Sequence, residues 1–297
     1  MAEGGSLFGM DMNLIADGNS TLEHNVPLER FYDDVVQFWS QTNVNYTPTL
    51  VVSYGGLAGD PYWRQAVDWT GHPLLRAHTP PAQLNAAFAR RTTAPESNFV
   101  DDDNAREAKK MADRGILVSI GAHGQQAGIG SHWELWSFVR GGMTPIEALR
   151  AGAIVPAQSL GMAKDIGSLE VGKLADLVVL DADPTADIRN SHKVSRVMLG
   201  GRLYDARTMD EVATGAAKRP AYWWERRADR ADRSPRVAAY PLWEPHEEAD
   251  GSGGPGGRRV VRAGRSAGAG ASGRADAGRG AGPGRGRVRR AFRRPGR

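Results

Sequence analysis

The sequence predicts an α/β protein, and three observations indicate this fold class. Strand-like apolar runs alternate with helix-like segments from residue 2 to about residue 142, as in a parallel α/β unit. A capped helix, a glycine-bearing turn and a short apolar run then follow between Gly142 and Asp181. Hydrophobic residues make up 40% of the 297 residues, which is enough apolar material for a sizeable core.

The first half of the chain contains two predicted strands and a predicted helix. Residues 46–52 are rich in strand formers, and Pro48 is expected at the start of that strand rather than at its centre. Residues 104–114 predict a helix that stops at Gly115. Residues 116–120 form an apolar run that predicts a buried strand directly after this helix.

The second half begins with a strong helix start. Thr144 is placed as an N-cap, with Pro145 at the first helical position and Glu147 three residues after the cap, which is the capping-box pattern. Apolar residues continue at helical spacing as far as Ile154. The run 177–180 is too short for a helix and predicts a buried strand.

A β-hairpin is predicted next to that strand. Residues 194–204 hold two short apolar runs on either side of Gly200 and Gly201, which suit a tight turn. We expect this hairpin to pair beside residues 177–180 in a small β-domain.

Composition excludes several classes of protein. The absence of cysteine excludes disulfides and cysteine-ligated zinc. The first residues lack the basic segment of a signal peptide, and no apolar run approaches 18 residues. We therefore expect no membrane association, with the cytoplasm as the default location.

The basic charge of the chain comes from its tail. Residues 251–297 carry 13 Arg and one Asp, while the rest of the chain has a net charge of −8. This Gly-rich and Arg-rich composition predicts disorder. Clustered Arg could neutralise the phosphates of a nucleic acid, but Phe292 is the single aromatic residue available for base stacking. We therefore favour a solvated appendage over a nucleic-acid-binding arm.

Residues 167–181, GSLEVGKLADLVVLD, resemble the C-terminal signature of the amidohydrolase superfamily. Other segments are similar to its imidazolonepropionase-like branch, which is often fused to a TolB-type β-propeller: LEH (22–24), YTPTLVVSYGG (46–56), GAHGQ (121–125) and GIGSHWELW (128–136). The resemblance spans about residues 2–224. It implies the C-terminal strands of a TIM-like (β/α) barrel in residues 1–165 and part of a small β-sandwich in residues 166–215. A C-terminal extension (216–250) and the disordered tail (251–297) would follow.

The resemblance also implies a chemistry. Members of this superfamily hold divalent metal ions, here expected to be Zn²⁺, at the carboxyl ends of the barrel strands. The metal activates a water molecule that hydrolyses a carbon–nitrogen bond. We therefore expect a non-peptide or dipeptide-like bond in a small amide-like substrate to be cleaved.

Individual positions match the family pattern as follows. His24 corresponds to the sixth-strand histidine ligand and Glu3 to the fifth-strand ligand. His123 stands where the family usually has an aspartate, and we expect it to serve as a metal ligand and as the general base. Three further residues are expected to contact the substrate: Tyr54, His132 and Glu134. The other histidines, at positions 72, 78, 192 and 246, lack supporting spacing and predict no role.

The match also has a gap. The family pattern requires His-x-His on the first strand, and this chain contains no such pair and begins where the fifth strand is expected. Zinc binding would then be weak or absent unless another chain supplies ligands, which leaves a homo-oligomer open. The alternative function is a truncated, non-catalytic remnant that acts by binding a partner.

Overall fold

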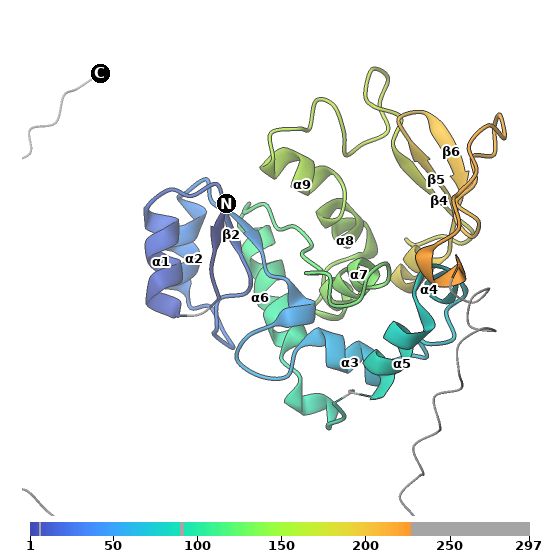
Figure 1. The fold of residues 1–297 in the computed structure, drawn as a ribbon. Coiled ribbons are helices and arrows are strands. Elements are labelled where there is room, and N and C mark those ends of the chain that lie inside the picture. Colours follow the sequence, from blue (N-terminus) through green and yellow to red (C-terminus); the bar gives the residue numbers. More distant parts are fainter. Residues whose placement is uncertain (6, 90–91, 227–297) are drawn as a thin grey trace, which may run out of the picture. The chain divides into compact units, whose positions relative to one another are not determined.

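The computed structural model describes residues 1–5, 7–89 and 92–226, all within a unit that runs from Met1 to Pro235. These residues form a mixed α/β structure with a parallel and an antiparallel three-stranded sheet (Figure 1). The predicted disorder of residues 251–297, and His246, lie outside the described residues.

The parallel sheet is formed by β1 (Ala2–Glu3), β2 (Thr21–Glu23) and β3 (Asn45–Thr47), in that order. Helix α1 (Phe8–Ala16) connects β1 to β2, and α2 (Asp33–Ser40) connects β2 to β3. A parallel pair requires a crossover connection of this kind, because the chain must return to the same end of the sheet. The predicted alternation of strands and helices is thus confirmed in this part of the chain.

The strand predicted for residues 46–52 is shorter than expected. β3 ends at Thr47, so Pro48 follows the strand instead of starting it, and Leu50–Val52 form a 3₁₀ helix, η1. Thr49, with φ of 50°, redirects the chain between them. The backbone N–H of Val51 donates to the carboxylate of Glu134 at 2.6 Å. The buried Glu134 carboxylate thus satisfies the N–H of Val51, which in a strand would have bonded to the neighbouring strand.

The strand predicted for residues 116–120 is reduced to a single parallel bridge. Val118 pairs with Tyr46, whose N–H donates to the carbonyl of Leu117 and whose carbonyl accepts from Ser119, both at 2.9 Å. The N–H of Ile120 then donates to a carbonyl at the end of a helix instead of to a strand. The segment therefore lies beside β3 but leaves the sheet after Ser119.

After β3 the chain is mainly helical as far as residue 159, and these helices pack largely against one another. Their bounds are α3 Gly59–Ala66, α4 Pro73–His78, α5 Pro81–Ala89, η2 Glu96–Asn98, α6 Asp101–Asp113, α7 Gly130–Arg140, α8 Pro145–Ala151 and α9 Ile154–Ser159. Helix α6 confirms the helix predicted for residues 104–114, and Gly115 follows it with φ of 85°. Fully buried aromatic side chains, among them Trp39, Tyr46 and Trp133, form the centre of the core.

The capping box predicted at Thr144 is present. The hydroxyl of Thr144 accepts from the N–H of Glu147 at 3.3 Å, and the Glu147 carboxylate accepts from the N–H of Thr144 at 2.7 Å. The helix is shorter than predicted, because α8 ends at Ala151 and Ile154 begins α9.

The antiparallel sheet contains β4 (Leu177–Leu180), β5 (Val194–Leu199) and β6 (Arg202–Asp205), in that order. The hairpin across Gly200 and Gly201 and its pairing beside β4 are confirmed. The predicted burial of β4 is wrong, because Val178 is 55% exposed and Val179 37%. β4 is an edge strand of this sheet, and its apolar character alone did not reveal that its two central side chains face solvent.

None of the helices in residues 1–5, 7–89 and 92–226 is long and apolar enough to cross a membrane.

The capping box leads to a stability prediction. Thr144→Ala should lower the free energy of unfolding by about 1 kcal/mol, because the N-terminal N–H groups of α8 lose their side-chain acceptor. Thermal and urea unfolding followed by circular dichroism measure this change. Thr93→Ala is the control, since Thr93 is exposed and makes no hydrogen bond within the described part of the chain. Equal stability of the two variants would contradict the prediction.

Candidate functional site

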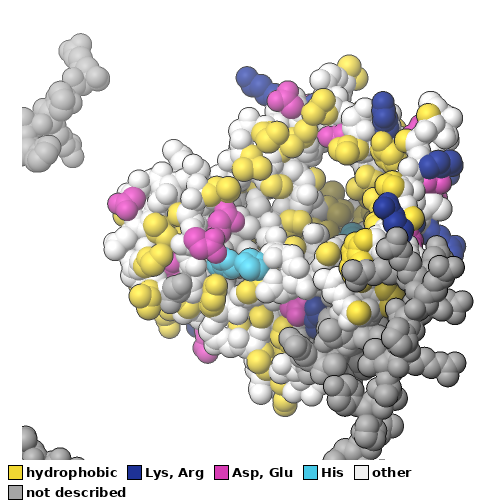
Figure 2. Space-filling model, viewed as in Figure 1, with side chains coloured by type: hydrophobic (Ala, Val, Ile, Leu, Met, Phe, Trp, Pro, Cys, Tyr) yellow, Lys and Arg dark blue, Asp and Glu magenta, His cyan; other side chains and the backbone are white. Residues whose placement is uncertain are grey.

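A cavity of about 300 Å³ lies over one face of the parallel sheet and reaches the carboxyl ends of its strands. We call it the strand-end cavity; it is lined by the ends of β1, β2 and β3, by residues 119–123 and by α9. Ligands of parallel α/β sheets bind at this edge, because the loops that follow the strands converge there. On the face shown in Figure 2, histidine side chains lie beside acidic side chains over the region of β1 and β2.

His24 and Glu3 meet in the strand-end cavity. His24 follows β2 and is 3% exposed, and its Nε2 lies 2.7 Å from Oε1 of Glu3 at the end of β1. The two residues are brought together because β1 and β2 are parallel neighbours. The Glu3 side chain is 75% exposed, so this contact lies at the mouth of the cavity. The Nδ1 atom of His24 is buried and has no partner among the described residues.

His123 and Tyr54 lie on either side of His24. The ring centroid of His123 is 5.0 Å from that of His24, and the ring of Tyr54 is 5.3 Å away. Nδ1 of His123 is 2.8 Å from the side-chain oxygen of Gln125, so its Nε2 remains available. The backbone of Tyr54 is held by two hydrogen bonds to the side chain of Asn25. The structure thus brings four predicted site residues together: Glu3, Tyr54, His24 and His123.

The backbone around this cavity is strained. His24, Thr49, Ala122 and His123 have φ values of 69°, 50°, 63° and 49°, a region that side chains other than glycine rarely adopt. Three of them line the cavity, and Ala122 directly precedes His123. Such strain costs roughly 1–3 kcal/mol per residue and is concentrated at functional sites, where it positions side chains.

Glu134 of α7 lies beneath this strained region instead of in the cavity. It is fully buried, and its carboxylate accepts from the N–H of Val51 at 2.6 Å and from that of Gly121 at 3.4 Å. Gly121 is required here, because a Cβ at this position would lie 2.1 Å from the hydroxyl of Thr49. Glu134 therefore holds η1 against the loop that carries His123.

Burial raises the pKa of Glu134 to about 7. The backbone N–H groups of Val51, Leu50 and Gly121 act in the opposite direction, and the nearby carboxylate of Asp101 adds to the increase. The carboxyl group therefore changes charge near neutral pH, although no solvent reaches it.

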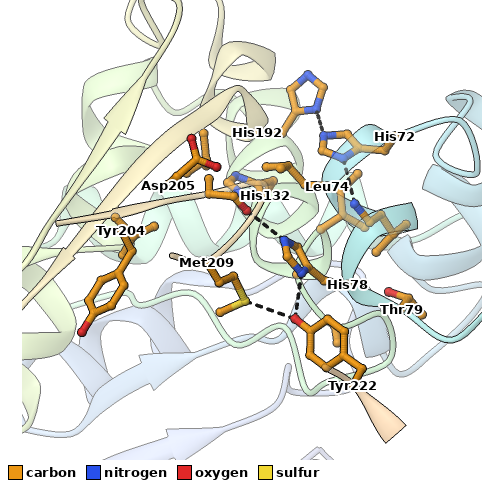
Figure 3. Close-up of a pocket in the computed structure, with 17 residues that line it drawn as sticks. His72, Leu74, His78, Thr79, His132, His192, Tyr204, Asp205, Met209 and Tyr222 are labelled. Carbon is orange, nitrogen blue, oxygen red and sulfur yellow. Dashed lines mark hydrogen bonds between the residues drawn. The ribbon is translucent and has the colours of Figure 1, made fainter. Parts of the chain in front are cut away.

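His132 lies in a different part of the molecule. It lines a second cavity, of about 420 Å³, together with His72, His78 and His192 (Figure 3). The sequence did not reveal this group, because its members are far apart along the chain: the hydrogen-bonded rings of His72 and His192 are separated by 120 residues. No local motif links them.

The strand-end cavity contains only part of a metal site. Among residues 1–5, 7–89 and 92–226, no group of three or more His, Cys, Asp or Glu is placed to hold a metal ion. Glu3 and His24 offer carboxylate and imidazole donors of the type that zinc prefers, but they are bonded to each other. A catalytic zinc takes three protein ligands, so these residues do not fit the complete site by themselves.

A family model described as "Amidohydrolase family" matches residues 10–204. Two similar curated proteins are both named imidazolonepropionase. That of Shouchella clausii is 49% identical over 55 residues, which cover 18% of this chain and 12% of the relative. That of Brevibacillus brevis is 31% identical over 119 residues, which cover 39% and 28%.

Solved structures with a similar fold include a Xaa-Pro dipeptidase with bound methionine, at 21% identity and a TM-score of 0.48, which covers 68% of this chain and 44% of that one. Molinate hydrolase matches at 19% identity and a TM-score of 0.49, with 74% and 45% covered. The matched part of this chain thus spans less than half of these proteins and less than a third of the two imidazolonepropionases.

The buried carboxyl group leads to a pH-dependent prediction. The pKa of Glu134 is about 7 in the fold against an ordinary 4.5, so the group is neutral at no cost below about pH 4.5. Between about pH 4.5 and pH 7 the carboxyl group ionises in the unfolded chain while it stays neutral in the fold. The free energy of unfolding therefore falls over this range, by roughly 3 kcal/mol in total. Glu134→Gln, which cannot ionise, should therefore gain stability relative to the wild type as the pH rises from 5 to 8.

Urea unfolding at several pH values measures this difference. Gln also loses an acceptor oxygen for the N–H of Gly121, which lowers stability equally at every pH. The change of the stability difference with pH is therefore the quantity that reports the pKa of Glu134. Glu29→Gln, at an exposed position, is the control and should show no such slope. A stability difference for Glu134→Gln that does not change with pH would contradict the raised pKa.

Proposed function

Because this chain belongs to the amidohydrolase family, we propose that its strand-end cavity takes part in hydrolysing a carbon–nitrogen bond of a small amide-like molecule. The convergence of Glu3, His24 and His123 on a strained backbone supports this assignment more than any other observation. The substrate class we propose is a non-peptide or dipeptide-like amide, cyclic amides included. The relatives named imidazolonepropionase and the hydrolases of similar fold are compatible with this class.

We propose the corresponding architecture for the chain. Residues 1–165 would be the C-terminal part of a TIM-like barrel, in which β1, β2 and β3 are successive barrel strands and Val118 marks the next one. Residues 166–215 would be part of a small β-sandwich, and residues 216–250 an extension. The parallel order of β1, β2 and β3 and the bridge between Tyr46 and Val118 support this arrangement.

The residues of the cavity have distinct proposed roles. His123, whose Nε2 is available, accepts the proton of the attacking water while the water oxygen bonds to the carbonyl carbon. The protonated imidazole then returns that proton to the nitrogen as the carbon–nitrogen bond breaks. Tyr54 packs edge-on against the ring of His24 but does not line the cavity, so its proposed contact requires a substrate that extends beyond the cavity. Glu134 positions the backbone of this region from below.

The family is typically metal-dependent, and we propose Zn²⁺ as the metal. If bound by residues of the strand-end cavity together with further ligands, it would supply Lewis-acid activation of water and of the scissile carbonyl. Glu3 and His24 are the ligand candidates of this chain; His123 could bind the metal through Nε2 only in place of its role as the base, because Gln125 occupies its Nδ1. Since they do not make up a complete site, we propose that further ligands come from outside the described residues.

Zinc titration of the purified chain tests this function. We expect bound zinc in a ratio of one or more per chain, measured by elemental analysis after dialysis, and zinc-dependent hydrolysis of members of a panel of cyclic and dipeptide-like amides. His123→Ala should lower kcat by at least about a hundredfold, the lower end of the contribution of a general acid–base group. Its far-ultraviolet circular dichroism should match that of the wild type.

A matched pair of variants separates ligand loss from a general loss of charge. Glu3→Gln should weaken zinc binding, because it replaces a carboxylate with a neutral amide, whereas Glu29→Gln at an exposed position should not. Zinc well below one per chain, together with no activity on adding metal, would contradict the hydrolase proposal. That outcome would favour the alternative, a non-catalytic member that binds a partner.

A further inference from the structure

The second cavity is separate from the strand-end cavity in its lining residues. Its walls come from α4, from the start of α7, from β5 and β6, and from Tyr222 (Figure 3). No lining residue is shared with the strand-end cavity. Its volume of about 420 Å³ lies within the range of cavities that hold small organic molecules.

Most polar groups of this cavity are already paired. His78 donates from Nε2 to the carbonyl of Ala206 at 2.8 Å, and its Nδ1 lies 2.8 Å from the hydroxyl oxygen of Tyr222, which also lies 3.1 Å from Sδ of Met209. His72 accepts at Nδ1 from the N–H of Leu75, so its proton is on Nε2 and is donated to Nδ1 of His192 at 2.8 Å. These contacts link the walls of the cavity to each other and involve both ring nitrogens of His72 and of His78.

His132 and His192 each keep one ring nitrogen that no described residue pairs with. The Nδ1 atom of His132 lies 3.2 Å from the hydroxyl oxygen of Ser191, which also accepts from the indole N–H of Trp136 at 3.0 Å. Ser191 is buried, and no other acceptor is paired with its hydroxyl within the described residues, so we assign the hydroxyl hydrogen to Nδ1 of His132 and the imidazole proton to Nε2. Within the described residues this Nε2–H has no acceptor, and His132 lines the cavity. The group is thus available to donate to a bound molecule.

The charges around the cavity favour an uncharged ligand. Burial lowers the pKa of His132 to about 4, and it also lowers those of His72 and His192, so all three rings are neutral near pH 7. No Lys or Arg is among the described lining residues. Asp205 is a lining residue whose carboxylate accepts hydrogen bonds from Thr208 and Arg207 and lies near Arg196; these contacts lower its pKa and offset its negative charge. An anion would be buried here without a compensating cation, which is costly.

We propose that this second cavity binds an uncharged, largely apolar molecule that carries a carbonyl oxygen, with His132 Nε2 as the hydrogen-bond donor. Apolar side chains such as Leu74, Ile129 and Val197 contact the body of the molecule. The site is independent of the proposed hydrolysis at the strand ends.

A fluorescent naphthyl ketone, 6-propionyl-2-(dimethylamino)naphthalene, is a direct probe, because its emission shifts to the blue in apolar surroundings. We expect saturable binding to the full chain with one probe per chain. The uncharged 2-acetylnaphthalene should displace it, and the anionic 2-naphthoate should not. No saturable binding, or equal displacement by the anion, would overturn the proposal even without any variant.

Two valines provide a matched pair of variants. Val197 and Val179 are both 37% exposed on neighbouring strands, but Val197 lines the cavity and Val179 does not. They belong to opposite faces of the sheet, since Val197 pairs with Val178 and Val179 with Arg196. Val197→Trp should weaken probe binding by about tenfold or more, whereas Val179→Trp should leave it unchanged. Equal effects would overturn the assignment of the probe to this cavity.

His132→Phe tests the hydrogen bond. The ring remains but the donor is lost, so we expect about tenfold weaker binding and a further blue shift of the bound probe. His123→Ala, in the strand-end cavity, should leave probe affinity unchanged. Weakened binding in His123→Ala would place the probe in the strand-end cavity and overturn the proposal. Because this readout involves no hydrolysis, it does not depend on whether the proposed function is right.

Discussion

The buried carboxyl group of Glu134 is the contact on which the geometry of the strand ends depends. It accepts backbone N–H groups from η1 and from the loop at Gly121, two segments separated by some 70 residues, and it comes from a third element, α7. An unpaired N–H in this water-free position is costly, so each segment is held where the carboxylate can reach it. The N–H donors around the carboxylate offset part of the cost of burying its charge, and burial still raises its pKa to about 7.

The elements that the sequence predicted correctly depend on local chemistry. The start of α8 is set by the capping box at Thr144, and the hairpin is set by Gly200 and Gly201, which have φ values of 54° and 79°. The errors arose where tertiary contacts decide. Residues 50–52 have the composition of a strand, but the carboxylate of Glu134 takes the N–H of Val51. β4 has the composition of a buried strand, yet Val178 and Val179, which point to opposite faces of the sheet, are both exposed, so burial depends on what packs over each face.

The candidate site likewise combines features that the sequence could predict with features that depend on tertiary contacts. The resemblance assigned Glu3 and His24 to the ends of the fifth and sixth barrel strands, and the structure places them at one edge of the sheet because β1 and β2 are parallel neighbours. The positive φ values of His24 and His123 could not be predicted, since neither residue type requires them. The second cavity was equally hidden: His72 and His192 come together only because the β-hairpin region folds back onto the helical part of the chain.

The placement of His132 and Glu134 follows from helix geometry. They are two residues apart on α7, so their side chains point about 200° apart around the helix axis. A single substrate could not contact both from one side, although their closeness in the sequence suggested a common role. Glu134 faces η1 and the His123 loop, while His132 faces Ser191 and the second cavity. Helix α7 therefore forms a shared wall: one face fixes the backbone beneath the strand-end cavity, and the opposite face presents a hydrogen-bond donor to the second cavity. His132 and Glu134, which the sequence suggested as contacts of one substrate, thus serve two different cavities.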